Sequence, residues 1–356
     1  MALDITRTRL RNQRLSGGRF AKPEEVVSWL GAVQAQEYGH AKWALGLRMQ
    51  RPADAQIETA FTEGRILRTH VMRPTWHFVA PADIRWMLAL TAPRVSAAIA
   101  VYNRRLELDA TVFRRSQRAI VRALRGGGQL TRQELKVALQ RAGIEADGVR
   151  LAFIVMQAEL DAVICSGARR GKQFTYALLD ERVPTSRTRL RDDSLTELAR
   201  RYFISHGPAQ LHDFAWWSGL SVADARGGLA AVEGEFASET VDGRTYWFSS
   251  KVRTLASRRA AYLLPLFDEY LIAYKDRRAA FDTSRWTRTA SHDPFSAPIV
   301  IDGQVVGGWK RIRKGGSVGI ALTAFAPLDK QHVVAVTDAA QAYTLFLGID
   351  LEVSWN

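Results

Sequence analysis

Two glutamines, Gln34 and Gln36, flank one small apolar residue, Ala35, near the start of the chain. Side chains two positions apart point to the same side of an extended segment but to nearly opposite sides of an α-helix. We therefore expect the preceding helix to end near Val33, with Gly39 permitting the break in the helix. Ala35 would then point inward while both amides point outward together.

A carboxamide side chain offers two hydrogen-bond donors and one acceptor without carrying charge. A pair of amides is therefore suited to holding a water molecule beside a centre that develops positive charge. Taken alone, the Gln-Ala-Gln pattern is a weak signal, because most glutamine pairs lie on solvated surface. Glu37 follows the pair directly. It is a possible assisting carboxylate, but we favour a structural role for it.

The net charge of the chain is +14, and it is distributed unevenly. Residues 1–125 hold 21 Lys and Arg against 10 Asp and Glu, whereas residues 201–356 hold 17 against 16. A basic, arginine-dominated first third indicates a polyanionic partner, most often nucleic acid. An arginine-rich proteome would also raise the charge, but it would not leave the last part of the chain nearly neutral.

The single cysteine, Cys165, excludes an internal disulfide framework and any cysteine-based metal cluster. The first residues, MALDITRTRLRNQRL, lack the apolar core of a signal peptide. No run of about 18 residues is free of charge, as a membrane span would require. We expect a cytoplasmic monomer that binds neither a membrane nor a metal ion or other cofactor.

The expected fold is α+β and mainly α, with more than one module because the chain has 356 residues. Predicted helices followed by a hairpin, the order of a winged helix, occupy residues 4–15, 23–30, 53–63, 66–71 and 75–79. Helices at 81–90 and 94–108 would connect this unit to two repeats of the same order. We place winged-helix modules at 1–110, 111–190 and 191–260, and a small β-rich module with a basic hairpin at 261–356.

Familiar catalytic motifs are missing from the sequence. There is no phosphate-binding P-loop, no H-E-x-x-H and no G-x-S-x-G. The seven histidines show no metal-ligand spacing, and we interpret His206 and His212 as capping or surface residues. A charged cluster near residue 270 is interpreted as buried ion pairs more readily than as an acid/base pair. It comprises Asp268, Glu269, Lys275 and Asp276.

Five segments together resemble a known family. They are AVQAQ at 32–36, LRTHVMRPTWH at 67–77, GPA through WWSGL at 207–220, LLPLFDEY through KDR at 263–277, and VGGWKR at 306–311. The chain resembles the AlkZ/YcaQ-type winged-helix proteins, bacterial DNA glycosylases that excise N7-alkylated guanines and unhook interstrand crosslinks. The resemblance implies a C-shaped scaffold of tandem winged helices around a basic concave surface.

The resemblance also implies which residues act. The catalytic motif of the crosslink-resistance branch is Gln-aliphatic-Gln, whereas YcaQ-like members carry Gln-x-Asp, so Gln36 places this chain in the first branch. Gln36 would orient the attacking water, and Gln34 would share that water or hold the nucleotide. Contacts to DNA, mostly to phosphates, would come from two hairpins that carry His70, Arg73, Trp76, His77, Lys310, Arg311, Arg313 and Lys314.

The chemistry of the implied substrate explains why uncharged side chains would suffice. Guanine alkylated at N7 is cationic and departs as a neutral base, so it needs little protonation by a general acid. What remains is to position a water and to tolerate an oxocarbenium-like sugar. The implied activity is that of a monofunctional DNA glycosylase acting on N7-alkylguanine in duplex DNA, including bulky genotoxin adducts or interstrand crosslinks.

Other functions stay open at this stage. A non-catalytic winged-helix DNA-binding protein, such as a transcriptional regulator, would keep the basic surface and owe nothing to the two glutamines. An RNA-binding or scaffold protein is a third possibility. The sequence does not distinguish N7-methylguanine from a bulky adduct or a crosslink, nor general repair from self-resistance.

Overall fold

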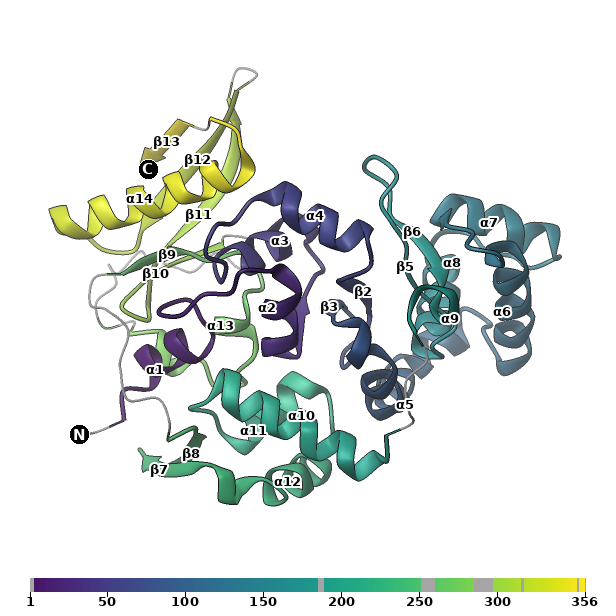
Figure 1. Cartoon of the computed structure of the whole chain (residues 1–356), viewed down its shortest axis with the longest axis horizontal. Coiled ribbons are helices and arrows are strands. Elements are labelled where there is room, and N and C mark those ends of the chain that lie inside the picture. Colours follow the sequence, from purple (N-terminus) through teal and green to yellow (C-terminus); the bar gives the residue numbers. More distant parts are fainter. Residues whose placement is uncertain are drawn as a thin grey trace.

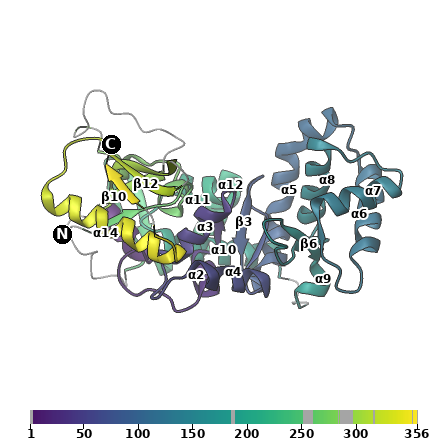
Figure 2. The same cartoon turned by 90° about the horizontal axis from the view of Figure 1, so that it is seen from above.

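The computed structural model describes residues 3–184, 189–250, 260–282, 284, 297–314, 317–350 and 352–355. The side chains of residues 313, 314, 317 and 318 are outside this description. The described elements form three helical modules and one sheet-based module (Figures 1 and 2). A short helix, α1 (Ile5–Asn12), precedes them, with the Asp4 side chain accepting a hydrogen bond from Arg7 N at its start.

Module 1 carries the two glutamines. Its strands form an antiparallel sheet in the order β1-β3-β2. The elements of module 1 are α2 (Pro23–Leu30), β1 (Ala32–Gln34), α3 (Tyr38–Gly46), α4 (Asp54–Thr62), β2 (Leu67–His70) and β3 (Trp76–Val79).

Module 2 follows a long helix, α5 (Pro81–Arg105), and repeats the order of module 1, with the sheet order β4-β6-β5. Its elements are α6 (Ala110–Leu124), β4 (Leu130–Thr131), α7 (Arg132–Arg141), α8 (Gly148–Leu160), β5 (Ile164–Ser166) and β6 (Thr175–Leu178). A short helix, α9 (Leu179–Arg182), ends the module.

Module 3 has the same order again, with its first strand reduced to a bridge between Ala209 and Trp247. Its elements are α10 (Arg191–His206), α11 (Leu211–Ser218), α12 (Val222–Ala230), a 3-10 turn (Glu233–Glu235), β7 (Ala237–Val241) and β8 (Arg244–Phe248). In all three modules the order is helix, strand, helix, helix, strand, strand, and the first strand or bridge pairs with the last strand.

The C-terminal module is a five-stranded sheet in the order β13-β12-β11-β10-β9, antiparallel except for the parallel pair β12–β13. Its elements are β9 (Ala261–Leu263), α13 (Glu269–Ile272), a 3-10 turn (Arg278–Ala280), β10 (Ala297–Ile301), β11 (Gln304–Lys314), β12 (Ser317–Ala324), α14 (Lys330–Leu347) and β13 (Glu352–Trp355). Trp43 of module 1 packs against Tyr343 and Phe346 of α14, so it is a core residue.

Several predictions of helices and caps are confirmed, and others are wrong. Helix α2 has the predicted ends, and Thr131 and Glu134 form the predicted capping box. Helix α3 was not predicted, because it is buried on nearly all sides from Ala41 to Gly46 and shows no alternation of polar and apolar faces. Helix α1 consequently lies outside the repeating order. The two helices predicted at 81–108 are one helix, α5, which continues through Pro93.

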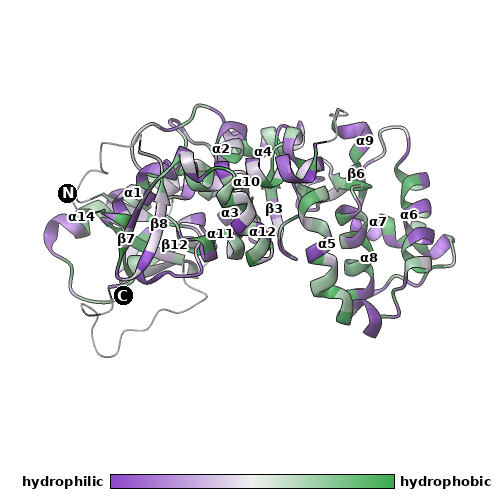
Figure 3. Ribbon diagram, turned by 90° about the horizontal axis from the view of Figure 1, so that it is seen from below, coloured by the Kyte–Doolittle hydropathy of each residue, from purple (hydrophilic) through white to green (hydrophobic). Residues whose placement is uncertain are grey.

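Helix α5 is long and apolar enough to cross a bilayer, yet half of its most apolar 18-residue window is buried inside the protein. It packs against α8 in a small core of Val95, Ile99, Met156 and Leu160. Figure 3 shows both helices with many hydrophobic residues. The length and composition of α5 therefore fit a core helix between modules 1 and 2.

A buried ion pair joins module 1 to the C-terminal module. Arg48 donates to both carboxylate oxygens of Asp268 at 2.9 Å, and neither side chain is exposed to solvent. The Arg48 Nε also donates to Gln13 O at 2.9 Å. Because each charge is fully hydrogen-bonded, removal of one partner would leave a costly buried charge. The predicted structural role of Asp268 is confirmed.

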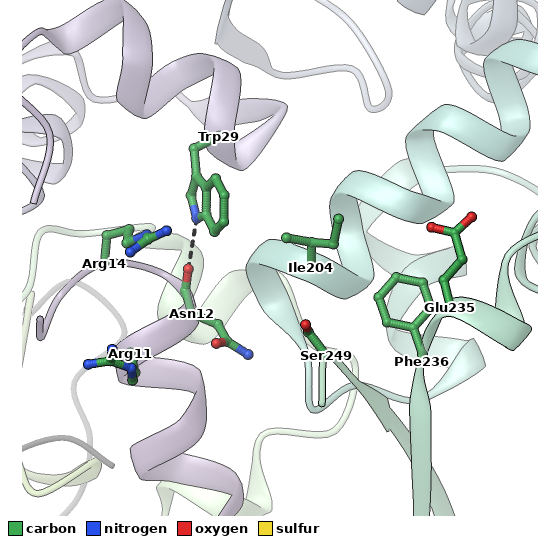
Figure 4. Close-up of a pocket in the computed structure, with 8 residues that line it drawn as sticks. All are labelled: Arg11, Asn12, Arg14, Trp29, Ile204, Glu235, Phe236 and Ser249. Carbon is green, nitrogen blue, oxygen red and sulfur yellow. Dashed lines mark hydrogen bonds between the residues drawn. The ribbon is translucent and has the colours of Figure 1, made fainter. Parts of the chain in front are cut away.

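Helix α1 is attached to two modules at once. The Trp29 indole of α2 donates to Asn12 O at 2.7 Å, the bond drawn in Figure 4. The Asn12 amide in turn donates to Gly207 O at 2.6 Å, at the end of α10. Helix α1 thereby links module 1 with module 3.

We expect Gly219→Ala to lower the free energy of unfolding by more than the backbone strain at a positive φ accounts for. Gly219 has φ +69°, and an added Cβ would lie 2.0 Å from Met72 O in the β2–β3 loop. The backbone strain contributes about 1–2 kcal/mol, and the collision adds to it. In Gly243→Ala, the matched control, φ is +73° but no atom lies within 4 Å of the added Cβ. Urea unfolding measures the loss of stability in both variants. Equal losses for Gly219→Ala and Gly243→Ala would contradict the close packing of Gly219 on Met72 O.

A candidate active site around the glutamine pair

Gln34 and Gln36, here called the amide pair, lie where β1 ends. Helix α2 stops at Leu30, and Gly31 takes φ +81° to redirect the chain into the strand. Ala35 is fully buried, Gln34 is partly exposed and Gln36 is exposed. The predicted burial of Ala35 between two more exposed glutamines is confirmed, and the placement of both amides in one site stays a prediction.

The residue that breaks the helix is not the predicted one. Gly39 lies inside α3, whereas Gly31 ends α2. A Cβ at Gly31 would lie 3.4 Å from the Trp217 ring of α11. The position therefore combines a positive φ with a close neighbour, and both favour glycine.

The backbone between the two amides is held on both sides. Ala35 N donates to Trp76 O at 2.7 Å, which extends the β1–β3 pairing by one residue. Ala35 O accepts a hydrogen bond from Arg68 Nε at 3.0 Å. Both polar groups of the buried residue are thus bonded, and the chain direction that aims Gln34 and Gln36 outward is fixed.

The carboxylate of Glu269 lies beneath Gln34. Its Oε1 accepts from Gln34 N at 3.0 Å, and its Oε2 accepts from Trp217 Nε1 at 2.9 Å. His206 Nε2 is 3.6 Å from the same Oε2. Burial acts to raise the pKa of Glu269, but His206, Arg73 and the Gln34 N–H outweigh it and hold that pKa below its ordinary value. Glu269 therefore stays anionic at neutral pH.

Sequence reasoning placed Glu269 in a charged cluster but not at this site. No spacing pattern links residues 34 and 269, because the contact is tertiary. The cluster itself is divided: Lys275 N and Asp276 N both donate to Asp213 Oδ1 in module 3. The interpretation of His206 as a capping or surface residue is wrong, since it is fully buried between Tyr202 and Trp217.

Arg73 and His77 surround Gln34. Arg73 Nη2 donates to Gln34 Oε1 at 3.4 Å, and burial lowers the pKa of the guanidinium. His77 pairs with Gln34 across the sheet, and its Nδ1 donates to Thr75 O at 2.9 Å. Burial, reinforced by Arg73, lowers the pKa of His77 to about 3. His77 is therefore neutral at physiological pH.

Two of the residues expected to contact DNA lie below the surface. His77 has no exposed area, and His70 is 5% exposed, hydrogen-bonded to Glu159 and packed on Trp76. Little of the His70 ring and none of the His77 ring is open to DNA in this structure, because the protein itself surrounds them. They shape the hairpin that carries Arg73 and Trp76, both of which are partly exposed.

The late basic hairpin lies apart from the amide pair. Lys310 and Arg311 are exposed on β11, near the hairpin that projects at the top of Figure 1. Arg313 and Lys314 also belong to β11, but their side chains lie outside the described residues. The same strand reaches the start of α3, where the Trp309 ring lies 5.6 Å from that of His40, measured between centroids.

Glu37 follows the amide pair and is exposed. It stands at the N-cap position of α3, but its side chain makes no capping bond there. Its backbone O accepts a hydrogen bond from Ala41 N at 2.8 Å, but its carboxylate has no hydrogen-bond or ion-pair partner among the described residues. The structure therefore gives no hydrogen bond or ion pair that would support a structural role for this carboxylate, which is exposed next to Gln36 in the sequence.

Two pockets are relevant to the site. One, of about 690 Å³, lies between modules 1 and 2 and is lined in part by Arg68 and Trp76, which bond the backbone of Ala35. The other, of about 680 Å³, lies between α1, α2 and module 3 (Figure 4). Arg11 and Arg14 line the second pocket, but no residue of the amide pair does.

The fold matches that of a solved DNA glycosylase. The structure of Streptomyces sahachiroi DNA glycosylase AlkZ superposes with a TM-score of 0.80 at 22% identity, covering 99% of this chain and 98% of that one. An interstrand DNA cross-link repair glycosylase, also from Streptomyces sahachiroi, is 24% identical over 93% of this chain and 92% of its own. The model of the family "DNA glycosylase AlkZ-like" matches residues 27–346. The chain belongs to the AlkZ-like DNA glycosylase family.

We expect the stability of the protein to fall in acid through His40, whose Nδ1 accepts from Leu266 N at 2.9 Å. Burial, with Arg311 second, lowers the pKa of His40 from 6.5 to about 4. The unfolded chain therefore binds a proton that the folded chain does not, so stability is lost as pH falls from 6.5 to about 4.

His40→Asn keeps an acceptor for Leu266 N and removes the titrating ring. The unfolding free energy of the wild type should fall more steeply than that of the variant, by up to about 1.4 kcal/mol per pH unit in this window. Parallel pH profiles from urea unfolding would show that His40 is not held neutral by the fold.

Proposed function

We propose that this protein is a monofunctional DNA glycosylase that hydrolyses the N-glycosidic bond of N7-alkylated guanine in duplex DNA. The observation that carries the proposal is the geometry of the amide pair: Ala35 is fully buried while Gln36 is exposed and Gln34 partly so. Membership of the AlkZ-like family supports it. Interstrand crosslinks are included among the proposed substrates, as the name of the relative suggests, and we propose bulky genotoxin adducts as well.

The three helical modules are proposed to be winged helices, and their shared strand pairing supports this. Their boundaries would be 1–110, 111–190 and 191–260, followed by the β-rich module at 261–356. The proposed partner is duplex DNA, and the protein would act on it as a cytoplasmic monomer. The excess of basic residues in the first third of the chain supports binding to a polyanion.

In the proposed mechanism Gln36 orients the attacking water and Gln34 shares it or holds the nucleotide. Gln34 is restrained, because its backbone N–H is bound by Glu269 and its side-chain oxygen by Arg73. Gln36 is exposed and can reach the substrate. A cationic N7-alkylguanine departs as a neutral base, so positioned amides and water replace a strong general acid.

The charges near Gln34 suit a transition state with positive character at the sugar. The anion of Glu269 and the cation of Arg73 both contact Gln34, so their fields largely offset each other there. Glu37, exposed and with no partner for its carboxylate among the described residues, is the proposed assisting carboxylate. It would favour the developing oxocarbenium ion and accept a proton from the water.

Gln36→Ala should reduce base release from an N7-alkylguanine duplex by about 10²–10³-fold, the usual effect of removing one positioned transition-state contact. Affinity for undamaged duplex should be retained, because the basic surface is unchanged. Gln34→Ala should also slow base release. Gln140→Ala, which removes an exposed amide from α7, is the matched control and should behave as wild type. Alkali-labile strand breaks report base release, and fluorescence anisotropy reports binding.

The same experiment separates the enzyme from a regulator. If the protein is a DNA-binding regulator, neither the wild type nor any of these variants will produce strand breaks. Wild-type base release that survives Gln36→Ala unchanged would remove the amide pair from the mechanism. A panel of N7-guanine adducts, from methyl to crosslink, would then define the substrate range.

A further inference from the structure

The pocket between modules 1 and 2, here called the inter-module pocket, contains an unpaired buried cation. Arg68 is 7% exposed, yet it forms no ion pair with a described residue. Its guanidinium lies between two rings, 4.3 Å from the Trp76 centroid and 4.5 Å from that of Phe174. Cation–π contacts stabilise the charge partly, but a desolvated guanidinium without an anion remains unfavourable.

Among the described residues, only one side-chain nitrogen of Arg68 has a hydrogen-bond partner. Nε donates to Ala35 O, whereas Nη1 and Nη2 donate no hydrogen bond to the described residues. The nearby carboxylate of Glu159 is bonded to His70. Two parallel N–H groups without a partner, at the wall of a pocket, form the fork that binds a phosphate in bidentate fashion.

The other charged residues that line the pocket are also basic. Arg132 and Lys136 are four residues apart on α7, and Lys172 lies in the β5–β6 loop. Lys136 is paired with Asp147, but Lys172 is exposed and has no partner among the described residues. No acidic side chain lines this pocket. Basic groups interleaved with aromatic rings are typical of surfaces that follow a nucleic-acid backbone.

We propose that the inter-module pocket is a phosphate subsite, in which Arg68 binds a phosphodiester of the damaged DNA strand with Lys172 and Arg132 at the rim. The proposal rests on the proposed function for its choice of DNA. One guanidinium then joins the bound strand to the amide pair, because its Nε holds Ala35 O and its Nη atoms hold the phosphate. Occupation of the subsite positions Gln34 and Gln36 relative to the strand.

The first test measures binding alone, so it does not depend on catalysis. Affinity for undamaged duplex is measured against salt concentration, where each lost phosphate contact lowers the logarithmic slope by about one. Lys172→Ala and Arg132→Ala should each show this reduction. Arg226→Ala removes an exposed arginine from α12, outside the pocket, and should affect the slope less than either. Equal slopes in all four proteins would overturn the subsite.

The second test concerns Arg68 itself. Arg68→Lys keeps the charge but cannot bind Ala35 O and a phosphate together, so base release should slow by about 10- to 10²-fold at saturating DNA. Thermal unfolding checks that the variant is folded. If it is not, Lys172→Ala and Arg132→Ala still decide the question through their salt slopes.

The two proposals fail in different ways. A wild type that releases no base, together with reduced slopes in the pocket variants, would end the glycosylase proposal and leave the subsite standing. Normal base release by the wild type, together with unchanged salt slopes in the pocket variants, would end the subsite proposal and leave the glycosylase proposal standing. In a third outcome, the variants Lys172→Ala and Arg132→Ala bind inorganic phosphate more weakly than the wild type while keeping its salt slope for DNA. That result would show a site for free anions and would also overturn the DNA subsite.

Discussion

The buried carboxylate of Glu269 is the constraint on which the rest of the site depends. An anion without solvent contact must be satisfied by donors from the protein. Here the donors come from two modules, because Gln34 N belongs to β1 and Trp217 Nε1 belongs to α11. The neighbouring Asp268 is satisfied in the same way by Arg48. Two adjacent residues of the C-terminal module thus hold module 1, and Glu269 also holds module 3. The position of the amide pair is therefore a property of the whole assembly rather than of the strand that carries it.

A second buried charge complements the first from the other side of Ala35. Arg68 holds the carbonyl of Ala35, while Glu269 holds the N–H of Gln34. Groups of opposite charge thus fix the backbone at two successive residues. Neither Glu269 nor Arg68 is a general acid at neutral pH, since the pKa of the carboxyl is depressed and burial lowers that of the guanidinium only to about 10. The chemistry proposed for the amides, positioning without proton donation, agrees with these surroundings.

Local patterns allowed much of the fold to be predicted, and tertiary contacts explain what was missed. Helix α2 could be found because proline and acids mark its start, and the capping box of Thr131 and Glu134 marks α7. The burial of Ala35 between two more exposed glutamines followed from the two-residue period of an extended chain. Helix α3 shows no such period, because the protein covers it on nearly all sides. The burial of His206 and the contact of Glu269 with Gln34 join segments far apart in sequence, and no local spacing encodes them.

The close contact between Gly219 and the loop after β2 affects which hairpins are able to move. In module 1 the carbonyl of Met72 lies against the turn that follows α11, where only hydrogen fits, and Met72 N is bonded to Thr91 Oγ1. The base of this loop is therefore held by the turn after α11 and by α5, and we expect it not to move independently of them. On the proposed function, adjustment to a distorted double helix would then belong to other parts of the protein than this hairpin. The β2–β3 hairpin, which lies next to the amide pair, would then stay in place and align the DNA strand.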